Sequence, residues 1–216
     1  MEKNLNFYRF NILNLAYSLI VIGWGAFVRA SGSGAGCGAH WPLCNGEVIP
    51  TSQRLQTLIE FTHRGSSGIS IALVAIGFFW ARRLAEKGSP IRKAAGLTAI
   101  AIVLEALLGA GLVLLRLVEF DQSALRAFSI SLHSVNTLFL LGSIATLTFF
   151  SKSPEAYLRK PSRLFPRDRL FIFTLCAFLA LAVSGAVTAL GDTLFPSTNL
   201  MSGMNEDFRA GAHFLV

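Results

Sequence analysis

Five long apolar stretches are the feature of this sequence that most constrains its fold. A helix that crosses a bilayer needs about 20 predominantly apolar residues. Five such stretches within 216 residues leave too little polar surface to enclose them in a soluble protein, so they predict membrane-spanning helices. The predicted spans are Phe10–Val28, Phe61–Ala81, Ala94–Leu115, Ala127–Phe150 and Leu170–Leu190.

The composition excludes the main alternatives to a membrane protein. Only 14% of the residues are charged and 53% are hydrophobic, whereas about a quarter of a soluble domain is charged. The low charge and the 18 Phe residues exclude disorder, and three Cys residues are too few for a disulfide-dense small domain. The sequence therefore predicts an all-α, polytopic membrane helical bundle.

The basic residues indicate how the chain crosses the membrane. Of the 19 Lys and Arg residues, 13 fall before the first span, between the second and third, or between the fourth and fifth. Because cytoplasmic loops carry the excess of Lys and Arg, these segments and the N-terminus are predicted to be cytoplasmic in a cell membrane. The net charge of +7 then reflects topology, and no nucleic-acid partner is expected beside the membrane lipid.

Two cysteines lie in the loop between the first two spans, which the topology places outside the cytoplasm. Cys37 and Cys44 are seven positions apart in a Gly-rich segment, where an oxidising compartment permits a disulfide. The alternative is zinc binding by Cys37, His40 and Cys44, but a closed structural zinc site takes four ligands. The disulfide is the favoured interpretation.

Two histidines are the candidate metal ligands. His63 and His133 lie near the same predicted end of the second and fourth spans, and titratable groups inside a membrane are costly and often functional. Two imidazoles at one level are suited to the axial ligation of a haem iron. Three arginines at the same ends of the spans are then candidates for pairing with the haem propionates; they are Arg29, Arg64 and Arg126.

Two carboxylates, one directly before the second span and one inside the third, leave alternatives open. Glu60 lies three residues before His63, so both share a helix face. It could accept a proton or stabilise a cation beside a haem edge, or it could be an acid favoured by the helix dipole. Glu105 is expected near the bilayer midplane, where a bond to a neighbouring helix is favoured over a proton route.

The fifth span resembles the first. With one gap, Gly25-Ala26-Phe27-Val28-Arg29-Ala30-Ser31-Gly32 matches Gly185-Ala186-Val187-Thr188-Ala189-Leu190-Gly191, and repeated units are a known plan of membrane proteins. We therefore expect a four-helix unit at 1–151 and the truncated start of a second at 168–216. The counterpart of His63 would fall roughly at position 223, beyond Val216, which predicts a longer protein of eight helices.

Several motifs resemble the haem A synthase family. They are Gly25-Ala-Phe-Val-Arg-Ala-Ser-Gly-Ser-Gly34, then Cys37 with Trp41-Pro42-Leu43-Cys44-Asn45-Gly46 and Pro50, then Glu60-Phe61-Thr62-His63-Arg64, and finally His133. The resemblance implies oxidation of the C8 methyl of haem O to a formyl group, which gives haem A for cytochrome oxidase. It also implies that His63 and His133 hold the substrate haem, that Glu60 is the essential carboxylate, and that Cys37 and Cys44 are the loop pair.

The resemblance implies cofactors and partners as well. Haem O and haem A are the expected substrate and product, and a haem b is expected in the C-terminal half. Haem O synthase, assembly factors of cytochrome oxidase and a second copy of the chain are candidate partners. The alternatives are a membrane b-type cytochrome that relays electrons and a haem carrier without catalysis, since both would share the two histidines.

Overall fold

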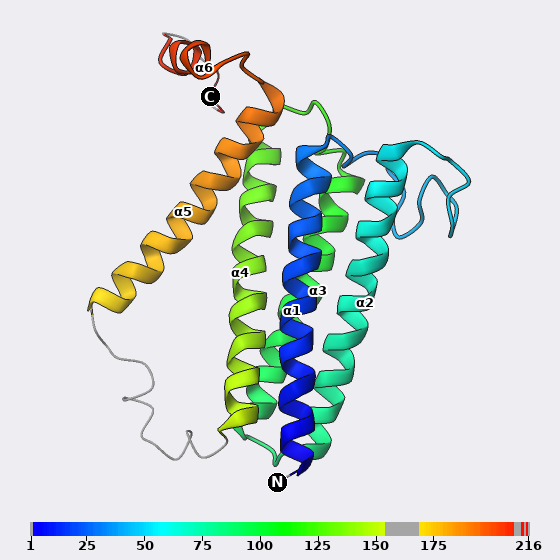
Figure 1. Cartoon of the computed structure of the whole chain (residues 1–216), viewed down its shortest axis with the longest axis vertical. Helices are drawn as coiled ribbons and strands as arrows, with labels where there is room; N and C mark the ends of the chain where they lie inside the picture. The colour runs from blue at the N-terminus through cyan, green and yellow to red at the C-terminus, as the bar shows by residue number, and fades with distance from the viewer. Residues whose placement is uncertain (1, 154–168, 210–212, 214, 216) are drawn as a thin grey trace. The chain divides into compact units, whose positions relative to one another are not determined.

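The structure is a computed structural model, and it describes residues 2–153, 169–209, 213 and 215. Within this part of the chain there are helices, turns and one isolated bridge, and no β-strand. The helices are α1 (Glu2–Ala30), α2 (Leu55–Leu84), α3 (Pro90–Leu114), α4 (Ala124–Lys152), α5 (Arg169–Leu194) and α6 (Leu200–Asp207) (Figure 1). The predicted all-α fold is confirmed.

The five predicted spans correspond to α1–α5. Each of these helices is long and apolar enough to cross a membrane, which indicates a multi-pass membrane protein. Four predicted spans lie wholly within their helices, and α3 ends one residue before the predicted Leu115. The helices extend beyond the apolar runs because flanking polar and basic residues continue the helix while their charged ends reach towards water.

Helix α6 was not predicted, because it is short and polar. Its start is defined by a capping box: the Ser202 backbone N–H donates to Asn199 Oδ1 at 2.8 Å, and the Asn199 N–H donates to Ser202 Oγ at 3.3 Å. Such reciprocal bonds satisfy amide groups that the first helical turn leaves without partners. A pattern search based on apolar runs does not detect this signal.

The chain divides into two compact units, which we describe separately. The first unit contains Met1–Ala26, Thr62–Leu107 and Asn136–Cys176, and the second contains Phe27–Phe61, Leu108–Val135 and Ala177–Val216. The boundary predicted between 1–151 and 168–216 falls on 154–168, outside the described residues, so that division remains a prediction. Four of the basic residues used for the topology also lie there, namely Arg159, Lys160, Arg163 and Arg167.

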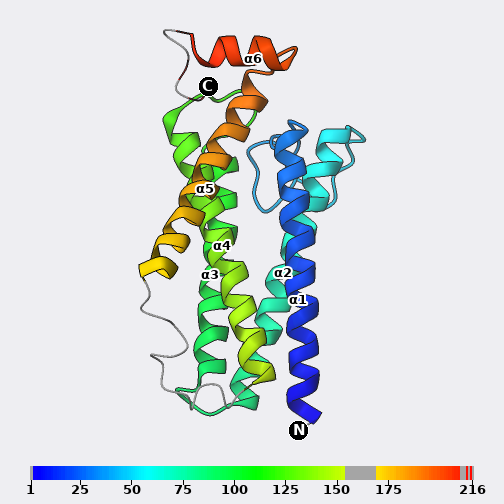
Figure 2. The same cartoon turned by 60° about the vertical axis from the view of Figure 1, so that its left-hand side comes forward.

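In the first unit, segments of α1, α2, α3 and α4 lie side by side (Figures 1 and 2). Large apolar side chains and alanines together make the contacts between them, and the alanines allow the helices to approach closely. One core cluster takes residues from all four helices: Phe7, Ala81, Ile91, Ala94, Ala95 and Leu147. A second, formed by α2, α3 and α4, comprises Val74, Ala101, Ile102, Leu140 and Ile144.

Glu105 joins α3 to α4 within the first unit. Its two carboxylate oxygens accept hydrogen bonds from Asn136 Nδ2 at 2.6 Å and from Thr137 Oγ1 at 2.5 Å. Asn136 Nδ2 also donates to the carbonyl oxygen of Ala101 at 3.0 Å. The favoured interpretation of Glu105, a bond to a neighbouring helix, is confirmed, since both donors belong to α4.

Replacing Glu105 with Leu should therefore destabilise the bundle. Two interhelical hydrogen bonds are lost, each worth about 0.6 kcal/mol on average in a membrane protein, and the half-buried Thr137 hydroxyl loses the bond to this carboxylate. We expect the free energy of unfolding to fall by about 1–3 kcal/mol, measured by denaturant titration in micelles, with a smaller loss for Glu105→Gln. The control is Thr98→Val, which removes a buried hydroxyl bonded to the Ala94 carbonyl of its own helix. Equal stability of Glu105→Leu and the parent protein would contradict this role.

The second unit contains the α1–α2 loop, the α3–α4 connection and most of α5. Its core cluster consists of Ala127, Ile130, Ala186, Leu190 and Leu215. Figure 2 shows α6 lying across the end of α5. Most α5 side chains are exposed apolar groups, such as Leu181 at 68% exposure, which suits a helix surrounded by lipid.

Candidate functional site

The α1–α2 loop is held together by a disulfide between Cys37 and Cys44. Their Cα atoms are 4.3 Å apart, and both residues are buried. The favoured sequence interpretation is thus confirmed, and both sulfurs are used in the bond rather than as zinc ligands. Among the described residues, no group of three or more His, Cys, Asp or Glu side chains could hold a metal ion.

A tight turn directly follows the second cysteine. Cys44 and Glu47 exchange backbone hydrogen bonds of 2.9 and 3.0 Å, and the two residues between them, Asn45 and Gly46, have φ angles of 54° and 85°. Positive φ at both central positions is typical of a type I′ turn, for which Asn-Gly is the preferred pair. The Asn45 N–H then donates to the Cys37 carbonyl oxygen at 2.9 Å.

The disulfide loop is docked on the first turns of α2. Thr57 Oγ1 donates to the carbonyl oxygen of Gly36 at 2.8 Å, and a Cβ atom on Gly36 would lie only 2.3 Å from the carbonyl oxygen of Gln56. Only glycine allows the loop backbone to approach the helix so closely. This contact requires Gly36 in a run whose glycines otherwise indicate a flexible loop.

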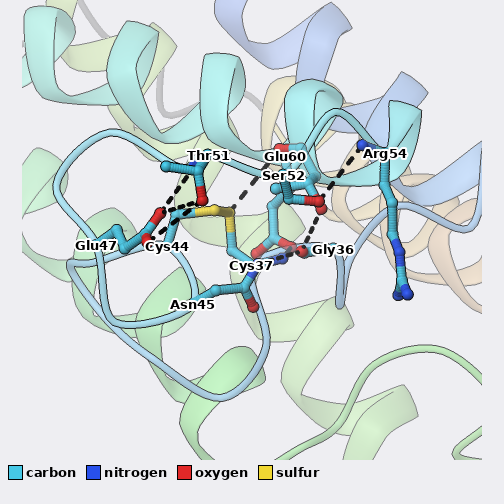
Figure 3. Close-up of a disulfide and its surroundings, with 10 residues drawn as sticks. Gly36, Cys37, Cys44, Asn45, Glu47, Thr51, Ser52, Arg54 and Glu60 are labelled. Carbon is cyan, nitrogen blue, oxygen red and sulfur yellow. Dashed lines mark hydrogen bonds between the residues drawn. A yellow bond between two sulfur atoms is a disulfide. The ribbon is translucent and has the colours of Figure 1, made fainter.

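Glu60 points at this docked loop (Figure 3). Its side chain is 3% exposed, and Oε2 accepts a hydrogen bond of 2.7 Å from the backbone N–H of Cys37. A charged acceptor makes such a bond stronger than a neutral pair. The structure thus brings together three predicted site residues, Cys37, Cys44 and Glu60, and fixes the carboxylate through the backbone of the disulfide loop.

Each predicted haem ligand faces a glycine on a neighbouring helix. In the first unit, a Cβ atom on Gly25 of α1 would lie 2.9 Å from His63 Cε1 and 3.1 Å from Nε2. In the second unit, a Cβ atom on Gly109 of α3 would lie 3.8 Å from His133 Nε2. Both imidazoles therefore present the edge that carries Nε2, a usual metal-binding nitrogen, to backbone that has no side chain.

Arg126 has part of its guanidinium unused. Nη1 donates to the carbonyl oxygens of Glu119 and Asp121, both at 2.7 Å. Its Nε is buried and has no hydrogen-bond partner among the residues that the structure describes. Arg29 belongs to the same unit, and its positive charge acts on that of Arg126. Two neighbouring cations with a donor to spare suit an anionic group such as a carboxylate.

Asp121 also orders the α3–α4 connection, whose carbonyl groups accept hydrogen bonds from Arg126. The Ser123 backbone N–H donates to Asp121 Oδ1 at 2.6 Å. Hydrogen bonds from the Ser123 side chain, and then from its backbone, lower the pKa of Asp121 below its usual value. Asp121 therefore stays ionised and fixes the backbone at Ser123, whose Oγ accepts a hydrogen bond of 3.2 Å from the Arg126 N–H at the start of α4.

The predicted site residues are distributed over the two units. Glu60, the cysteines, Arg29, Arg126 and His133 belong to the second unit, whereas His63 and Arg64 belong to the first. Joint ligation of one iron by His63 and His133, and the role of Arg64, therefore remain predictions. Sequence reasoning did not find Gly25, Gly36 and Gly109. The available signal was that Gly25 begins one of the family motifs and that Gly36 directly precedes Cys37.

Comparison with known proteins identifies the family of this chain. The helices and the site define a multi-pass membrane protein with a disulfide loop over a buried carboxylate. A family model described as cytochrome oxidase assembly protein, COX15-CtaA, matches residues 8–215. The chain belongs to this family, which also confirms the resemblance to haem A synthases.

Individual relatives carry two different names. The chain is 46% identical over 202 residues to "Protoheme IX farnesyltransferase" of Thermus thermophilus, a match that covers 94% of this chain and 33% of the relative. It is 37% identical over 189 residues to "Heme A synthase" of Alkalihalophilus pseudofirmus, covering 86% of the chain and 60% of the relative. A third, "Heme A synthase" of Halalkalibacterium halodurans, is 42% identical over 139 residues, or 63% of this chain and 45% of the relative. The chain thus spans a third to three fifths of the first two relatives.

Proposed function

We propose that this chain forms the haem O site of a haem A synthase, which oxidises the C8 methyl of haem O to a formyl group and so makes haem A for cytochrome oxidase. The observation that carries the proposal is the placement of Glu60. It is a buried carboxylate, held by the Cys37 N–H at 2.7 Å, three residues before His63 on the same helix. The family match and the relatives named heme A synthase support the proposal.

The name of the Thermus relative fits this proposal. Only a third of that protein matches the chain, which leaves two thirds of it to which the farnesyltransferase name can apply. The relatives named heme A synthase match over larger shares of their own lengths. We therefore assign the matched segment to the oxidation of haem rather than to farnesyl transfer.

The residues present fit a haem group. His63 and His133 would ligate the iron, and the place of the His63 imidazole depends on Gly25, where an added Cβ would lie 3.1 Å from Nε2. Arg29, Arg64 and Arg126 would hold the propionates, which is supported by the buried Arg126 Nε that has no partner in the described part of the chain. The bound haem supplies a redox-active iron conjugated to the methyl group that is oxidised.

Glu60 would act on the substrate as a proton acceptor or as a fixed negative charge. Oxidation of a methyl to a formyl group takes two successive hydroxylations followed by loss of water. Each hydroxylation breaks a C–H bond, releases a proton and passes two electrons to an external electron acceptor. A carboxylate fixed in a buried site accepts a proton, or stabilises positive charge, without first reorganising. The hydrogen bond of 2.7 Å from the Cys37 N–H to Oε2 keeps the carboxylate in place.

The proposal includes a location and partners. We place the chain in the cell membrane with its N-terminus in the cytoplasm and the disulfide loop outside, where oxidising conditions maintain the Cys37–Cys44 bond. Residues 1–151 would form the substrate-haem unit and 168–216 the start of a second unit that holds a haem b. Haem O synthase would supply the substrate, assembly factors of cytochrome oxidase would receive the product, and a homo-oligomer would fit the same membrane setting.

Pigment extraction from the full-length protein tests the function. The protein is purified from cells that make haem O, and the extracted haems are identified by mass and by their reduced pyridine spectra. Formylated haem is the expected result. Protohaem alone would favour a relay cytochrome, and bound but unmodified haem O would favour a carrier, so either result would contradict the proposal.

A further inference from the structure

We propose that Gly25 is a positioning residue for His63. Because glycine has no side chain, the His63 imidazole can pack directly against the backbone of α1. The proposal rests on the function proposed above, in which His63 binds the substrate iron. All the residues that carry it belong to the first unit. The contact itself is close: a methyl group on Gly25 would meet His63 Cε1 at 2.9 Å and Nε2 at 3.1 Å.

Two glycine contacts of the seam between α1 and α2 lie fourteen residues apart. Gly25 lies opposite His63, and fourteen positions earlier on α1 the Phe10–Asn11 pair lies opposite Gly77, where an added Cβ would meet Phe10 Cε1 at 3.2 Å and Asn11 Oδ1 at 3.8 Å. Residues seven apart share a helix face, and the two helices are antiparallel. Ser18 must therefore lie opposite Ser70, midway between the two observed pairs.

The middle of the seam is closely packed. Ser18 and Ser70 are each 3% exposed, and both hydroxyls are buried without a hydrogen-bond partner among the described residues. Small side chains that meet across a seam allow two membrane helices to approach closely. The close contact between the two helices would be lost if α1 moved to make room for a larger residue at position 25.

Hydrogen bonds and ring contacts fix the register of the same two helices. Tyr17 donates its hydroxyl hydrogen to the carbonyl oxygen of Ser66 at 3.1 Å, and Trp24 Nε1 donates to Thr62 Oγ1 at 3.2 Å. At the other end of the seam, the rings of Phe7 and Phe10 lie 5.4 and 5.5 Å from that of Trp80. The backbone of Gly25 therefore cannot shift along His63 without breaking these contacts.

A methyl group at Gly25 will consequently move the imidazole rather than the helix. The atoms it would meet are at the far end of a side chain that rotates about two bonds, whereas α1 is held along its length. The fold persists and His63 loses its place, with Nε2 turned away from its present position. Gly109 differs, because the corresponding distance to His133 Nε2 is 3.8 Å, which is an ordinary van der Waals contact.

The test compares three Gly→Ala variants of the full-length protein in micelles. Gly25→Ala is the test variant. Gly23→Ala is the matched control on the same helix, since no atom lies within 4 Å of an added Cβ there, and Gly109→Ala is the control at the other histidine. In haem-free protein with ¹⁵N-labelled histidine, the His63 imidazole resonances, assigned by their absence from His63→Ala, should move in Gly25→Ala and stay in both controls.

Haem titration gives the second readout. We expect Gly25→Ala to lose the low-spin absorption and EPR signature of two imidazole ligands and to bind haem at least about 10-fold more weakly, while Gly23→Ala and Gly109→Ala match the parent. Unchanged His63 resonances and haem affinity in Gly25→Ala would overturn the proposal. If even the parent protein binds no haem, the proposed function fails, and the resonances of the haem-free protein still decide the role of Gly25.

A double variant decides the matter if Gly25→Ala does not fold. Removal of the imidazole removes the contact, so Gly25→Ala/His63→Ala should fold and melt at the temperature of His63→Ala alone. Failure of the double variant to fold would place the defect in the α1 backbone, and this would overturn the assignment of Gly25 to His63.

Discussion

Replacing Glu60 with Gln is expected to lower the rate of formyl formation by about 10²–10⁴-fold while haem remains bound. The amide oxygen of Gln can still accept the hydrogen bond from the Cys37 N–H, which in the parent protein measures 2.7 Å. The loop therefore stays docked on α2, and only the proton acceptor and its charge are lost. The rate is measured as haem A formed per protein, with haem content determined on the same sample.

Two further variants separate chemistry from position. Glu60→Leu removes the hydrogen-bond acceptor as well as the charge, so it should also release the Cys37 backbone and increase the proteolysis of the loop. Glu47→Gln is the matched control: this loop carboxylate is exposed and accepts from the Thr51 N–H at 2.8 Å. It should leave haem A formation unchanged. Normal haem A output from Glu60→Gln would exclude Glu60 as the base or the fixed charge.

The fold was largely predictable because the membrane imposes a simple rule. Inside the hydrocarbon every backbone polar group must be satisfied within the segment, so an apolar run of sufficient length is a helix. The predicted Leu170–Leu190 is therefore contained in α5 even though few of its side chains are buried. Helix α6 shows the limit of this rule, since its start depends on Asn199 and Ser202 and not on apolar length.

The chemistry of the site was predictable where the type of a side chain alone indicates its role. Two cysteines in an oxidising loop indicate a disulfide, and a carboxylate next to a histidine indicates a candidate site. Gly25 and Gly36 escaped prediction because a glycine has no side chain whose chemistry could be interpreted. Their roles appear only when a second element lies against them, His63 in one case and the Gln56 carbonyl in the other. Such contacts between distant segments are not encoded in local spacing.

Replacing His63 or His133 with Ala is expected to abolish the low-spin spectrum of the substrate haem in the full-length protein. A haem iron that both imidazoles would hold keeps only one of them in either variant, so haem affinity should fall by more than the roughly 10–100-fold that is typical of changes to residues that only support a ligand. His40→Ala is the control, because His40 lies in the α1–α2 loop outside the predicted ligand set. Haem titration followed by absorption and EPR measures the outcome.

The double variant His63→Ala/His133→Ala shows whether the two imidazoles share one iron. If they do, each single variant already removes the whole low-spin signal of this site, and the double variant loses no more, because groups that act as one unit are not additive. If each histidine served a separate haem, each single variant would lose only part of the signal and the losses would add. That additive result would contradict a shared iron site for His63 and His133. It would also remove the reason for placing Glu60 beside the methyl group of the substrate haem.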